Sequence, residues 1–484
     1  MWNQYFQPTD FFIIIPHLEL TLFALGILLT DFLLEPKYKY LNAVAALIGV
    51  TFSAVQLWRM RKLEVLGFAG SLIVDPFFIF FSFIFLIATA LVILMSIRYL
   101  EIEAEHHGEY YALMLLANVG MMFMAGGLDL ITLFIGLELM AISFYILTGF
   151  LRGDRRSNEA ALKYLLLGAF SSGILVYGMS LLYGISGSTN IVPIARTVAE
   201  RQLNDPIVFL ATVTIAAGMF FKVAAVPFHQ WAPDVYEGAP TTITAYVSVA
   251  SMAASFAMLM RLFLVPIGPV RGNWVELLSA VCIATMTVGN LAAITQSNIK
   301  RLLAYSSIGH VGYILLGIVA GNRTGLQGVA IYIFVYLFMT IGAFAVVVAM
   351  RRRDLIGDEI DDMAGLFCKN PVATVAMMIF LLSLAGIPPT AGFLGKYFIF
   401  ASLIEARRYV LAVIAVLYVA VALYYYFRIV VTMFMGTPRE PGRLSLAPGV
   451  NLTLAVTCLL TLVAGIYPEP FIRFAQYSVL GPFR

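Results

Sequence analysis

The sequence predicts an all-α polytopic membrane protein of about 14 transmembrane helices, with two inverted five-helix repeats that each contain a broken helix. Three observations predict this class. The 484 residues are 61% hydrophobic and only 12% charged, whereas a soluble domain carries about 25% charge. Prolines interrupt two of the apolar stretches. Three charged residues, Glu138, Lys222 and Lys396, lie deep inside apolar stretches.

The apolar stretches divide the chain into predicted spans. A helix that crosses the hydrocarbon needs about 20 apolar residues. Stretches of that kind are found at 11–33, 41–58, 74–97, 110–127, 130–150, 160–184, 206–231, 241–264, 274–295, 301–320, 326–349, 371–404, 409–434 and 449–468. The longest loop, 350–370, is expected to lie on the surface.

This division predicts four parts. They are three N-terminal helices (1–109), a first inverted repeat (110–264), a second inverted repeat (265–435) and a C-terminal helix (436–484). The first residues lack the basic segment and the cleavage site of a signal peptide, so we expect the first helix to be retained.

The distribution of basic residues predicts the orientation. If the N-terminus lies outside, the inner loops hold sixteen of the 30 Lys and Arg residues, in agreement with the positive-inside rule. We therefore expect a multi-pass protein of a bacterial inner (plasma) membrane, with the N-terminus on the periplasmic side. An organelle-encoded protein would have a similar sequence.

Two spans contain internal prolines. They are FFKVAAVPFHQWAPDVYEGAPT (220–241), with Pro227 and Pro233, and LAGIPPTAGFLGKYFIF (384–400), with Pro388 and Pro389. Proline removes a donor and clashes with the preceding turn, so both helices should break. Broken backbone is tolerated in a membrane only where it faces protein or a water-filled cavity. Breaks five predicted spans apart, each near a lysine, point to the ion path of a transporter.

Glu138, Lys222 and Lys396 are each the only formal charge in a long apolar stretch. A charge at the centre of a spanning helix costs roughly 2.5–3.5 kcal/mol. Burial penalises the ionised form of both residue types, which suits them to exchange protons. If Glu138 and Lys222 face each other at 4 Å, each stabilises the other's charge by about 4 kcal/mol. Moving or discharging the carboxylate would then release the proton from Lys222, and Lys396 would be the terminal donor or acceptor of the second half.

Three further residues have competing interpretations. Lys163, near the start of its span, either reaches the interface with its charge or takes part in the function. His229 follows Pro227 and is either a member of a water chain or a capping residue. His310 lies mid-span near Ser306, Ser307 and Tyr313. It is either a hydrogen-bonded core residue or a proton relay. An intramembrane ion pair of Glu138 with Lys222 can also be merely structural.

The sequence does not indicate a metal, nucleotide or nucleic-acid site. The three cysteines are far apart and form no CxxC motif, so we expect no iron–sulfur or zinc site and no metal. No phosphate-binding glycine motif is present, and a net charge of +3 does not indicate a nucleic-acid partner. We expect no cofactor in this chain and a lipid bilayer around it.

Several motifs resemble those of a known family. The strongest are DLITLFIGLELMAISFYILTGF (129–150), NEAALKYLLLGAFSSGILVYG (158–178), GISGSTN (184–190) and NIKRLLAYSSIGHVGY (298–313). Together with the broken helices, they resemble the N subunits (subunit 2) of respiratory complex I, the proton-pumping NADH:quinone oxidoreductase. The broken helices and RLLAYSS are shared with the wider antiporter-like family.

The resemblance implies a proton-translocating subunit that couples quinone reduction elsewhere in the complex to pumping, with no redox centre of its own. Its implied partners are the antiporter-like M subunit and the small K-, J- and A-type subunits. It implies that Glu138 is the fifth-helix glutamate, Lys163 the sixth-helix lysine, Lys222 the seventh-helix lysine and Lys396 the twelfth-helix lysine.

One position departs from the family pattern. The eighth helix usually carries a lysine or histidine, and Met252 occupies that place here. A thioether cannot carry a proton. Either Ser248, Ser251 and Ser255 hold water there, or His310 is the substitute connector between the two halves.

Two alternative functions share this fold. One is a sodium/proton antiporter subunit, which sodium-dependent exchange without quinone reductase partners would favour. The other is a scaffold that only anchors electron-transfer subunits, which unchanged pumping after substitution of Lys222 or Lys396 would favour.

Overall fold

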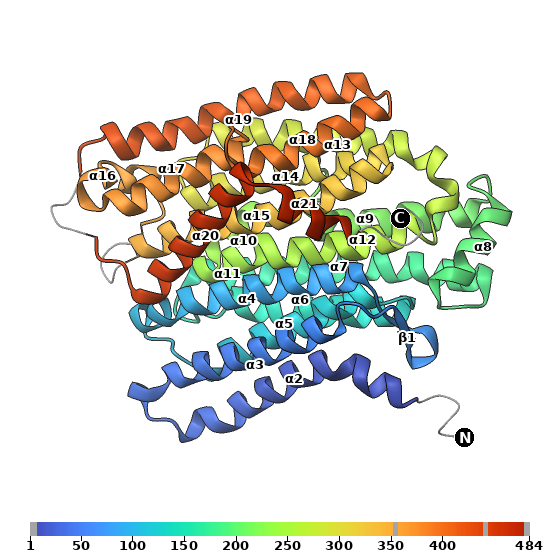
Figure 1. Cartoon of the computed structure of the whole chain (residues 1–484), viewed down its shortest axis with the longest axis horizontal. Helices are drawn as coiled ribbons and strands as arrows, with labels where there is room; N and C mark the ends of the chain where they lie inside the picture. The colour runs from blue at the N-terminus through green and yellow to red at the C-terminus, as the bar shows by residue number, and fades with distance from the viewer. Residues whose placement is uncertain (1–6, 352–356, 439–443, 479–484) are drawn as a thin grey trace.

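The computed structural model describes residues 7–351, 357–438 and 444–478 and is a bundle of long helices that lie side by side (Figure 1). Within these residues, 11 helices are long and apolar enough to cross a membrane. The chain is therefore a multi-pass membrane protein, and the predicted fold class is confirmed. The two predicted broken spans appear as pairs of shorter helices, and the number of fourteen spans stays a prediction.

The first part of the chain runs from the first helix, through the first break, to residue 264. Its helices are α2 (Pro8–Thr30), α3 (Tyr40–Met60), α4 (Pro76–Glu103), α5 (Gly108–Gly126), α6 (Leu130–Thr148), α7 (Arg155–Ser186), α8 (Ile191–Arg201), α9 (Pro206–Lys222), α10 (Trp231–Gly238), α11 (Thr241–Tyr246) and α12 (Met252–Leu264). A π-helical turn, Val247–Ser251, joins α11 to α12.

The second part begins after α12. Its helices are α13 (Arg271–Ile294), α14 (Ile299–Ala320), α15 (Arg323–Met350), α16 (Leu366–Lys369), α17 (Pro371–Ala385), α18 (Ala391–Glu405), α19 (Tyr409–Met435), α20 (Pro448–Ile466) and α21 (Glu469–Gln476). The helix Thr241–Leu264, α14 and α15 are almost wholly buried, whereas α2, α19 and α20 expose much of their apolar surface. The core of the bundle is therefore built from the helices that lie between the two breaks.

Local sequence explains where many helices begin. An Asp or Asn side chain accepts a hydrogen bond from the first free amides of eight helices: Asp75, Asp129, Asp154, Asn190, Asp205, Asn298, Asn322 and Asn370. Such caps satisfy donors that have no partner inside the helix. Proline occupies the first helical position of α4, α9 and α17, where its missing N–H costs nothing.

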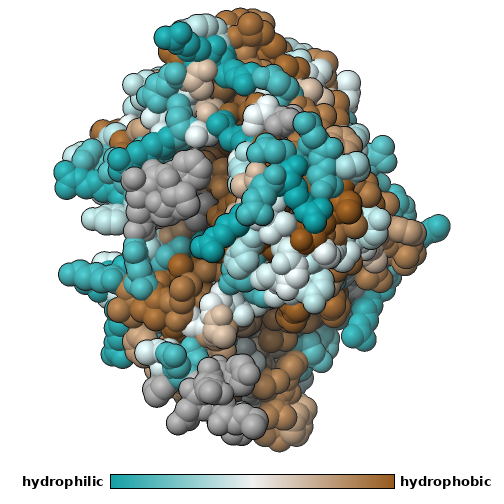
Figure 2. Space-filling view, turned by 90° about the vertical axis from the view of Figure 1, so that its right-hand side faces the viewer, coloured by the Kyte–Doolittle hydropathy of each residue, from teal (hydrophilic) through white to brown (hydrophobic). Residues whose placement is uncertain are grey.

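The two ends of the bundle differ. One end, which we call the hairpin end, carries α8 and a short hairpin of β1 (Val65–Gly67) and β2 (Leu72–Val74), with Val65 opposite Val74. Figure 2 looks onto this end, where hydrophilic side chains are spread over the face with hydrophobic ones between them. The opposite end, the loop end, carries the predicted loop 350–370, of which residues 352–356 lie outside the described part. Asp358 in this loop accepts a backbone hydrogen bond from Ile299, at the start of α14 (2.7 Å).

The C-terminal helix α20 covers the second break. Gly465, near the end of α20, lies so close to the segment between α17 and α18 that a Cβ there would be 2.6 Å from the carbonyl carbon of Thr390 and would overlap the carbonyl oxygen of Pro389. Only glycine permits this approach of backbone to backbone.

Candidate functional site

The first broken helix places a buried lysine where it stops. α9 ends at Lys222, and residues 223–230 are not helical. Pro227 lies in this interruption, as predicted, whereas Pro233 lies in the first turn of α10, where a missing N–H is tolerated. Lys222 is 4% exposed, and its Nζ donates a hydrogen bond to Tyr145 Oη at 3.3 Å. The ammonium group is therefore held by a phenol of a different helix, α6.

Glu138 lies on α6, about two helical turns before Tyr145. It is half-buried, and its Oε1 is buried without a hydrogen-bond partner among the described residues. Its charge interacts electrostatically with both Lys222 and Tyr145. Within the described part of the chain, however, no ion pair joins Glu138 to Lys222. The direct contact considered from the sequence is therefore replaced by an indirect one, in which Tyr145 touches Lys222 and Glu138 acts from further away.

The second broken helix holds its lysine differently. α17 ends at Ala385, and Lys396 lies on α18, after the break. The side chain reaches back across the break, so that Nζ donates to the carbonyl oxygens of Leu384 (3.0 Å) and Ala385 (2.8 Å). These are the last carbonyls of α17, where the helix dipole places partial negative charge. Lys396 is 3% exposed, and besides this backbone cap, its Nζ lies over the ring of Tyr313, 5.1 Å from the ring centroid.

His310 belongs to the second half-site. It lies on α14, is 3% exposed, and interacts electrostatically with Lys396. Its Nδ1 is 2.7 Å from Tyr332 Oη, and its Nε2 is 3.1 Å from Tyr426 Oη. A neutral imidazole donates at one nitrogen and accepts at the other, so each hydroxyl has a complementary partner. Both interpretations of His310, a satisfied core residue and a relay, are compatible with these contacts.

Lys163 lies in a charged cluster near the loop end. Its side chain is 43% exposed and pairs with Glu159 (2.9 Å) and Asp234 (2.8 Å). Arg301 of α14 pairs with the same Asp234 (2.9 Å) and with Glu237 (3.0 Å). The cluster lines a cavity of about 240 Å³. Lys163 therefore links α7 to α10, the second half of the broken helix. Among the described residues, no hydrogen bond or ion pair joins it to Lys222.

His229 lies in the non-helical segment 223–230 and is half-buried. Its Nδ1 is buried without a hydrogen-bond partner among the described residues, and its carbonyl oxygen accepts from the amide of Ala232 (3.0 Å). Its backbone thus helps to start α10, while its ring interacts with the backbone of Pro227.

In the eighth predicted span, residue 252 has no titratable side chain. Met252 is 4% exposed and follows the π-helical turn. The hydroxyl of Ser248 donates to the carbonyl of Ala245 (2.9 Å), and that of Ser255 donates to the carbonyl of Ser251 (2.8 Å). Two of the three serines are therefore bound to their own helix, which weakens the hypothesis that they alone hold a water chain.

Several charged groups with buried atoms were not singled out from the sequence, among them Lys300 and Glu19. Lys300, assigned there to an inner loop, is 3% exposed, donates to the carbonyl of Ala239 (2.8 Å) and lies 3.7 Å from Asp358. Burial raises the pKa of the Asp358 carboxyl, and the positive charge of Lys300 opposes that shift. Glu19 is the only formal charge from residue 11 to 30, and its Oε2 is buried without a partner among the described residues. The signal that identified Glu138 would have identified Glu19.

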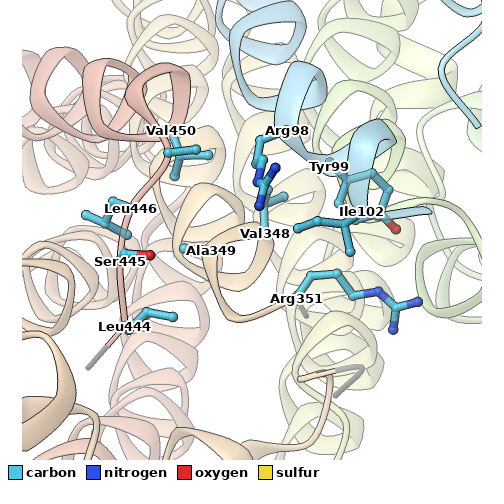
Figure 3. Close-up of a pocket in the computed structure, with 11 residues that line it drawn as sticks. Arg98, Tyr99, Ile102, Val348, Ala349, Arg351, Leu444, Ser445, Leu446 and Val450 are labelled. Carbon is cyan, nitrogen blue, oxygen red and sulfur yellow. The ribbon is translucent and has the colours of Figure 1, made fainter. Parts of the chain in front are cut away.

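A cavity of about 370 Å³ lies apart from these groups, between the ends of α4 and α15 and the start of α20 (Figure 3). Arg98 and Arg351 line it together with apolar side chains. Arg351 pairs with Glu103 (2.5 Å) and Arg98 with Glu101 (2.9 Å). Both guanidinium groups are thus neutralised, and no predicted site residue lines this cavity.

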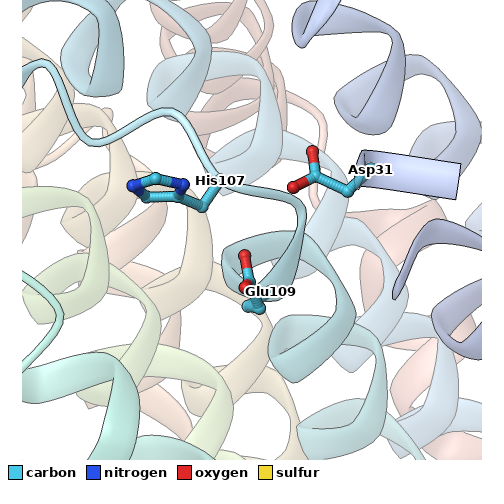
Figure 4. A group of neighbouring side chains, drawn as sticks. All are labelled: Asp31, His107 and Glu109. Carbon is cyan, nitrogen blue, oxygen red and sulfur yellow. The ribbon is translucent and has the colours of Figure 1, made fainter. Parts of the chain in front are cut away.

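Asp31, His107 and Glu109 form a small group near the loop end (Figure 4), and each offers a ligand atom within 4.8 Å of the others. Asp31 already accepts hydrogen bonds from Lys39 (3.0 Å) and Asn42 (2.5 Å). Because Lys39 neutralises this carboxylate, the group gives no argument for a metal ion. The expectation that the chain binds no metal stays a prediction.

Comparison with known proteins extends these observations. A family model described as "NADH:quinone oxidoreductase/Mrp antiporter, TM" matches residues 127–422, which include all six predicted site residues. NADH-quinone oxidoreductase subunit N 2 of Solibacter usitatus is 56% identical over 99% of both chains. NADH-quinone oxidoreductase subunit N 1 of Koribacter versatilis is 52% identical over 97% of this chain and 96% of the relative.

Solved structures share the fold. A chain of respiratory complex I from Thermus thermophilus is 30% identical, with a TM-score of 0.81 over 95% of this chain and 99% of that chain. A chain of the Mrp complex from Dietzia sp. DQ12-45-1b has a TM-score of 0.83 over 95% of this chain and 97% of that chain. At 20% identity, the latter likeness shows the fold alone.

Two broken helices with buried lysines, within a bundle of spanning helices, define an antiporter-like membrane protein. The family match and the relatives make the assignment more specific. The chain belongs to the NADH:quinone oxidoreductase/Mrp antiporter family, and within it to the N subunits of NADH-quinone oxidoreductase. The resemblance recognised from the sequence is confirmed.

Proposed function

We propose that this chain translocates protons across the membrane as the antiporter-like subunit of an NADH:quinone oxidoreductase, driven by quinone reduction in other subunits. The single observation that carries the proposal is the pair of buried lysines, Lys222 and Lys396, at the two helix breaks. Ionisable groups that face the interior of a membrane bundle are costly and mark ion pathways. Broken backbone beside them gives water a place to reach the ammonium groups.

The residues have different roles in this proposal. Lys222 holds a proton against Tyr145, and the charge of Glu138 sets how firmly it is held. Lys396 is the terminal group of the second half, and His310, which interacts with Lys396, is the connector to the first half. Lys163 acts near the loop end, where it orients α10 through Asp234, and His229 acts in the non-helical segment that follows Lys222.

The assembly follows from the family. We propose that the chain assembles with the antiporter-like M subunit and the small K-, J- and A-type subunits, in a bacterial inner membrane with the N-terminus on the periplasmic side. In this proposal the chain holds no redox centre and no cofactor, so the energy for pumping arrives from partner subunits as a conformational or electrostatic signal.

The test is proton pumping by the intact complex in sealed vesicles. Lys222→Met and Lys396→Met keep the length of each side chain and remove its charge, and we expect each to lower pumping at least about tenfold. Lys37→Met is the matched control, because Lys37 is exposed and pairs with the exposed Glu35. Pumping at the parental rate in both variants would favour a scaffold. Sodium-dependent exchange without quinone reductase partners would favour a sodium/proton antiporter.

A further inference from the structure

The stretch between the two half-sites has no titratable side chain at residue 252, and this gap needs a different connection. Met252 is buried at the start of α12, directly after the π-helical turn. A thioether sulfur is only a weak acceptor and has no proton to donate. Buried hydroxyl groups on α7, α10, α14 and α15 offer a different path: those of Tyr164, Tyr236, Ser307 and Tyr336.

On the side of Lys222, the first of these groups is Tyr164 on α7. Its ring packs edge-on against Tyr145, the hydrogen-bond partner of Lys222, at a centroid distance of 4.8 Å. Its hydroxyl interacts with that of Ser251, the residue before Met252. Tyr164 therefore links the hydrogen-bond partner of Lys222 to the turn that precedes Met252.

The next hydroxyl belongs to Tyr236 on α10. It lies 3.5 Å from the hydroxyl of Ser307 on α14 and interacts electrostatically with Tyr164 on one side and Tyr336 on the other. Tyr236 is 4% exposed and Ser307 is 5% exposed. This pair joins the second half of the first broken helix to α14, the helix that carries His310.

Ser307 lies on the same helix as His310 of the second half-site. It precedes His310 by three residues on α14, so the two side chains lie on neighbouring turns of one face. The hydroxyl of Tyr336 interacts with Ser307, and its ring centroid is 5.2 Å from that of His310. His310 in turn contacts Tyr332 and Tyr426.

We propose that Tyr236 and Ser307 form a hydroxyl relay that connects the Lys222 half-site to His310 and replaces the missing titratable group at residue 252. This inference rests on the proposed function of proton translocation. A hydroxyl both accepts and donates a hydrogen bond, so it can take a proton on its oxygen while it passes its own proton to the next oxygen. Each passage leaves both groups neutral, and rotation of the two hydroxyls resets them.

The test removes one hydroxyl and keeps its ring. Tyr236→Phe retains the packing against Trp231 (6.4 Å between ring centroids), and we expect proton pumping by the intact complex to fall about tenfold. Ser307→Ala should reproduce the loss. Tyr110→Phe is the matched control, because Tyr110 is as deeply buried and binds two hydroxyls, those of Ser96 and Thr242, outside this region. It should pump at the parental rate.

A second variant separates relay from packing. Met252→His restores a titratable group at the gap, and we expect it to recover most of the pumping that Tyr236→Phe loses. Three results would each overturn the relay. The first is proton pumping at the parental rate by Tyr236→Phe, and the second is an equal loss of pumping in Tyr110→Phe. The third is a Met252→His substitution that assembles and pumps normally by itself but restores no pumping to Tyr236→Phe. If Met252→His does not assemble, Ser307→Ala decides: pumping at the parental rate overturns the relay. If Lys222→Met and Lys396→Met pump normally, the proposed function itself fails. If these two variants lose pumping while Tyr236→Phe pumps normally, only the relay is overturned.

Discussion

The two half-sites hold their lysines by different means. Lys222 ends the helix before its break and donates to the side chain of Tyr145, within the field of Glu138. Lys396 follows its break and donates to two backbone carbonyls of α17. A helix dipole is a fixed property of the backbone, whereas a carboxylate and a phenol can move or change their charge. The first half-site is therefore the one that a signal from partner subunits can modulate, and the second is held constant.

The breaks differ in their backbone as well. The second break has Gly386 at φ +87°, directly beside the stem of Lys396. The first break has Ala224 at φ +57°, the left-handed region that glycine favours. The second break thus depends on a glycine for space, whereas the first accepts a side chain at the corresponding bend.

The largest effect is expected at Gly386. Gly386→Ala would place a Cβ 2.7 Å from Cδ of Lys396 and would strain a left-handed backbone. We expect the thermal midpoint of the detergent-solubilised complex to fall by the equivalent of about 1–3 kcal/mol, and pumping to fall with it because Lys396 is displaced. Gly173→Ala, where nothing lies within 4 Å, is the control. A Gly386→Ala variant that pumps and melts like the parent would contradict the backbone cap.

Glu138→Gln should have the next largest effect. It keeps the shape of the side chain and removes the charge that acts on Lys222. An interaction beyond direct contact is worth about 1 kcal/mol at the effective dielectric of protein, so we expect pumping to fall about fivefold. The variant should be non-additive with Tyr145→Phe and additive with Gly386→Ala, because only the first pair shares a site. Additivity with both of these variants would show that Glu138 does not act on Lys222.

Tyr145→Phe removes the acceptor for Lys222 and keeps the aromatic ring. The hydrogen bond is long, at 3.3 Å, so we expect a loss of stability of about 0.5–1.5 kcal/mol, measured as a lower thermal midpoint, together with a modest fall in pumping. Tyr246→Phe is a useful control, since that buried hydroxyl binds Thr89 and not a lysine. Equal pumping by both variants would show that Tyr145 does not hold the ammonium group.

A smaller effect is expected at Lys163. Its ion pairs are partly exposed, and such pairs contribute about 0.2–1 kcal/mol. Lys163→Met should lower the thermal midpoint in low salt, and the difference should disappear at 1 M salt, where the Debye length is about 3 Å. A salt-independent loss would mean that Lys163 acts by something other than its charge on Asp234.

The smallest effect is expected at Ala224. Ala224→Gly relieves a left-handed conformation that costs about 1–2 kcal/mol but adds chain entropy worth about 0.5–1 kcal/mol to the unfolded state. We expect a slightly higher thermal midpoint and unchanged pumping. A clear loss of pumping would show that the Cβ of Ala224 shapes the first half-site.

The broken helices and the buried lysines were predictable from the sequence because their causes are local. A proline in the interior of a helix removes a donor and disfavours the helix there, although Pro16 lies inside the continuous α2. A lone lysine in an apolar stretch is costly in any fold. Pro233 shows the limit of this argument, since it lies in the first turn of a new helix, where the same residue does no harm.

The partners of the lysines were not predictable, because they depend on contacts between distant segments. Nothing in the sequence indicates that Lys396 reaches back to Ala385, or that Tyr145 rather than Glu138 touches Lys222. Lys300 lies at the boundary of an apolar stretch and was assigned to a loop. It is buried only because α10 and the loop around Asp358 close over it.

The place of Gly465 has a consequence for how the protein is made. The helix that covers the second break, α20, is translated after both halves of that break, so Pro389 and Thr390 meet Gly465 only after α20 has been inserted. A ribosome that stops before residue 448 therefore leaves a chain that contains both lysines but lacks the helix that packs on the second break.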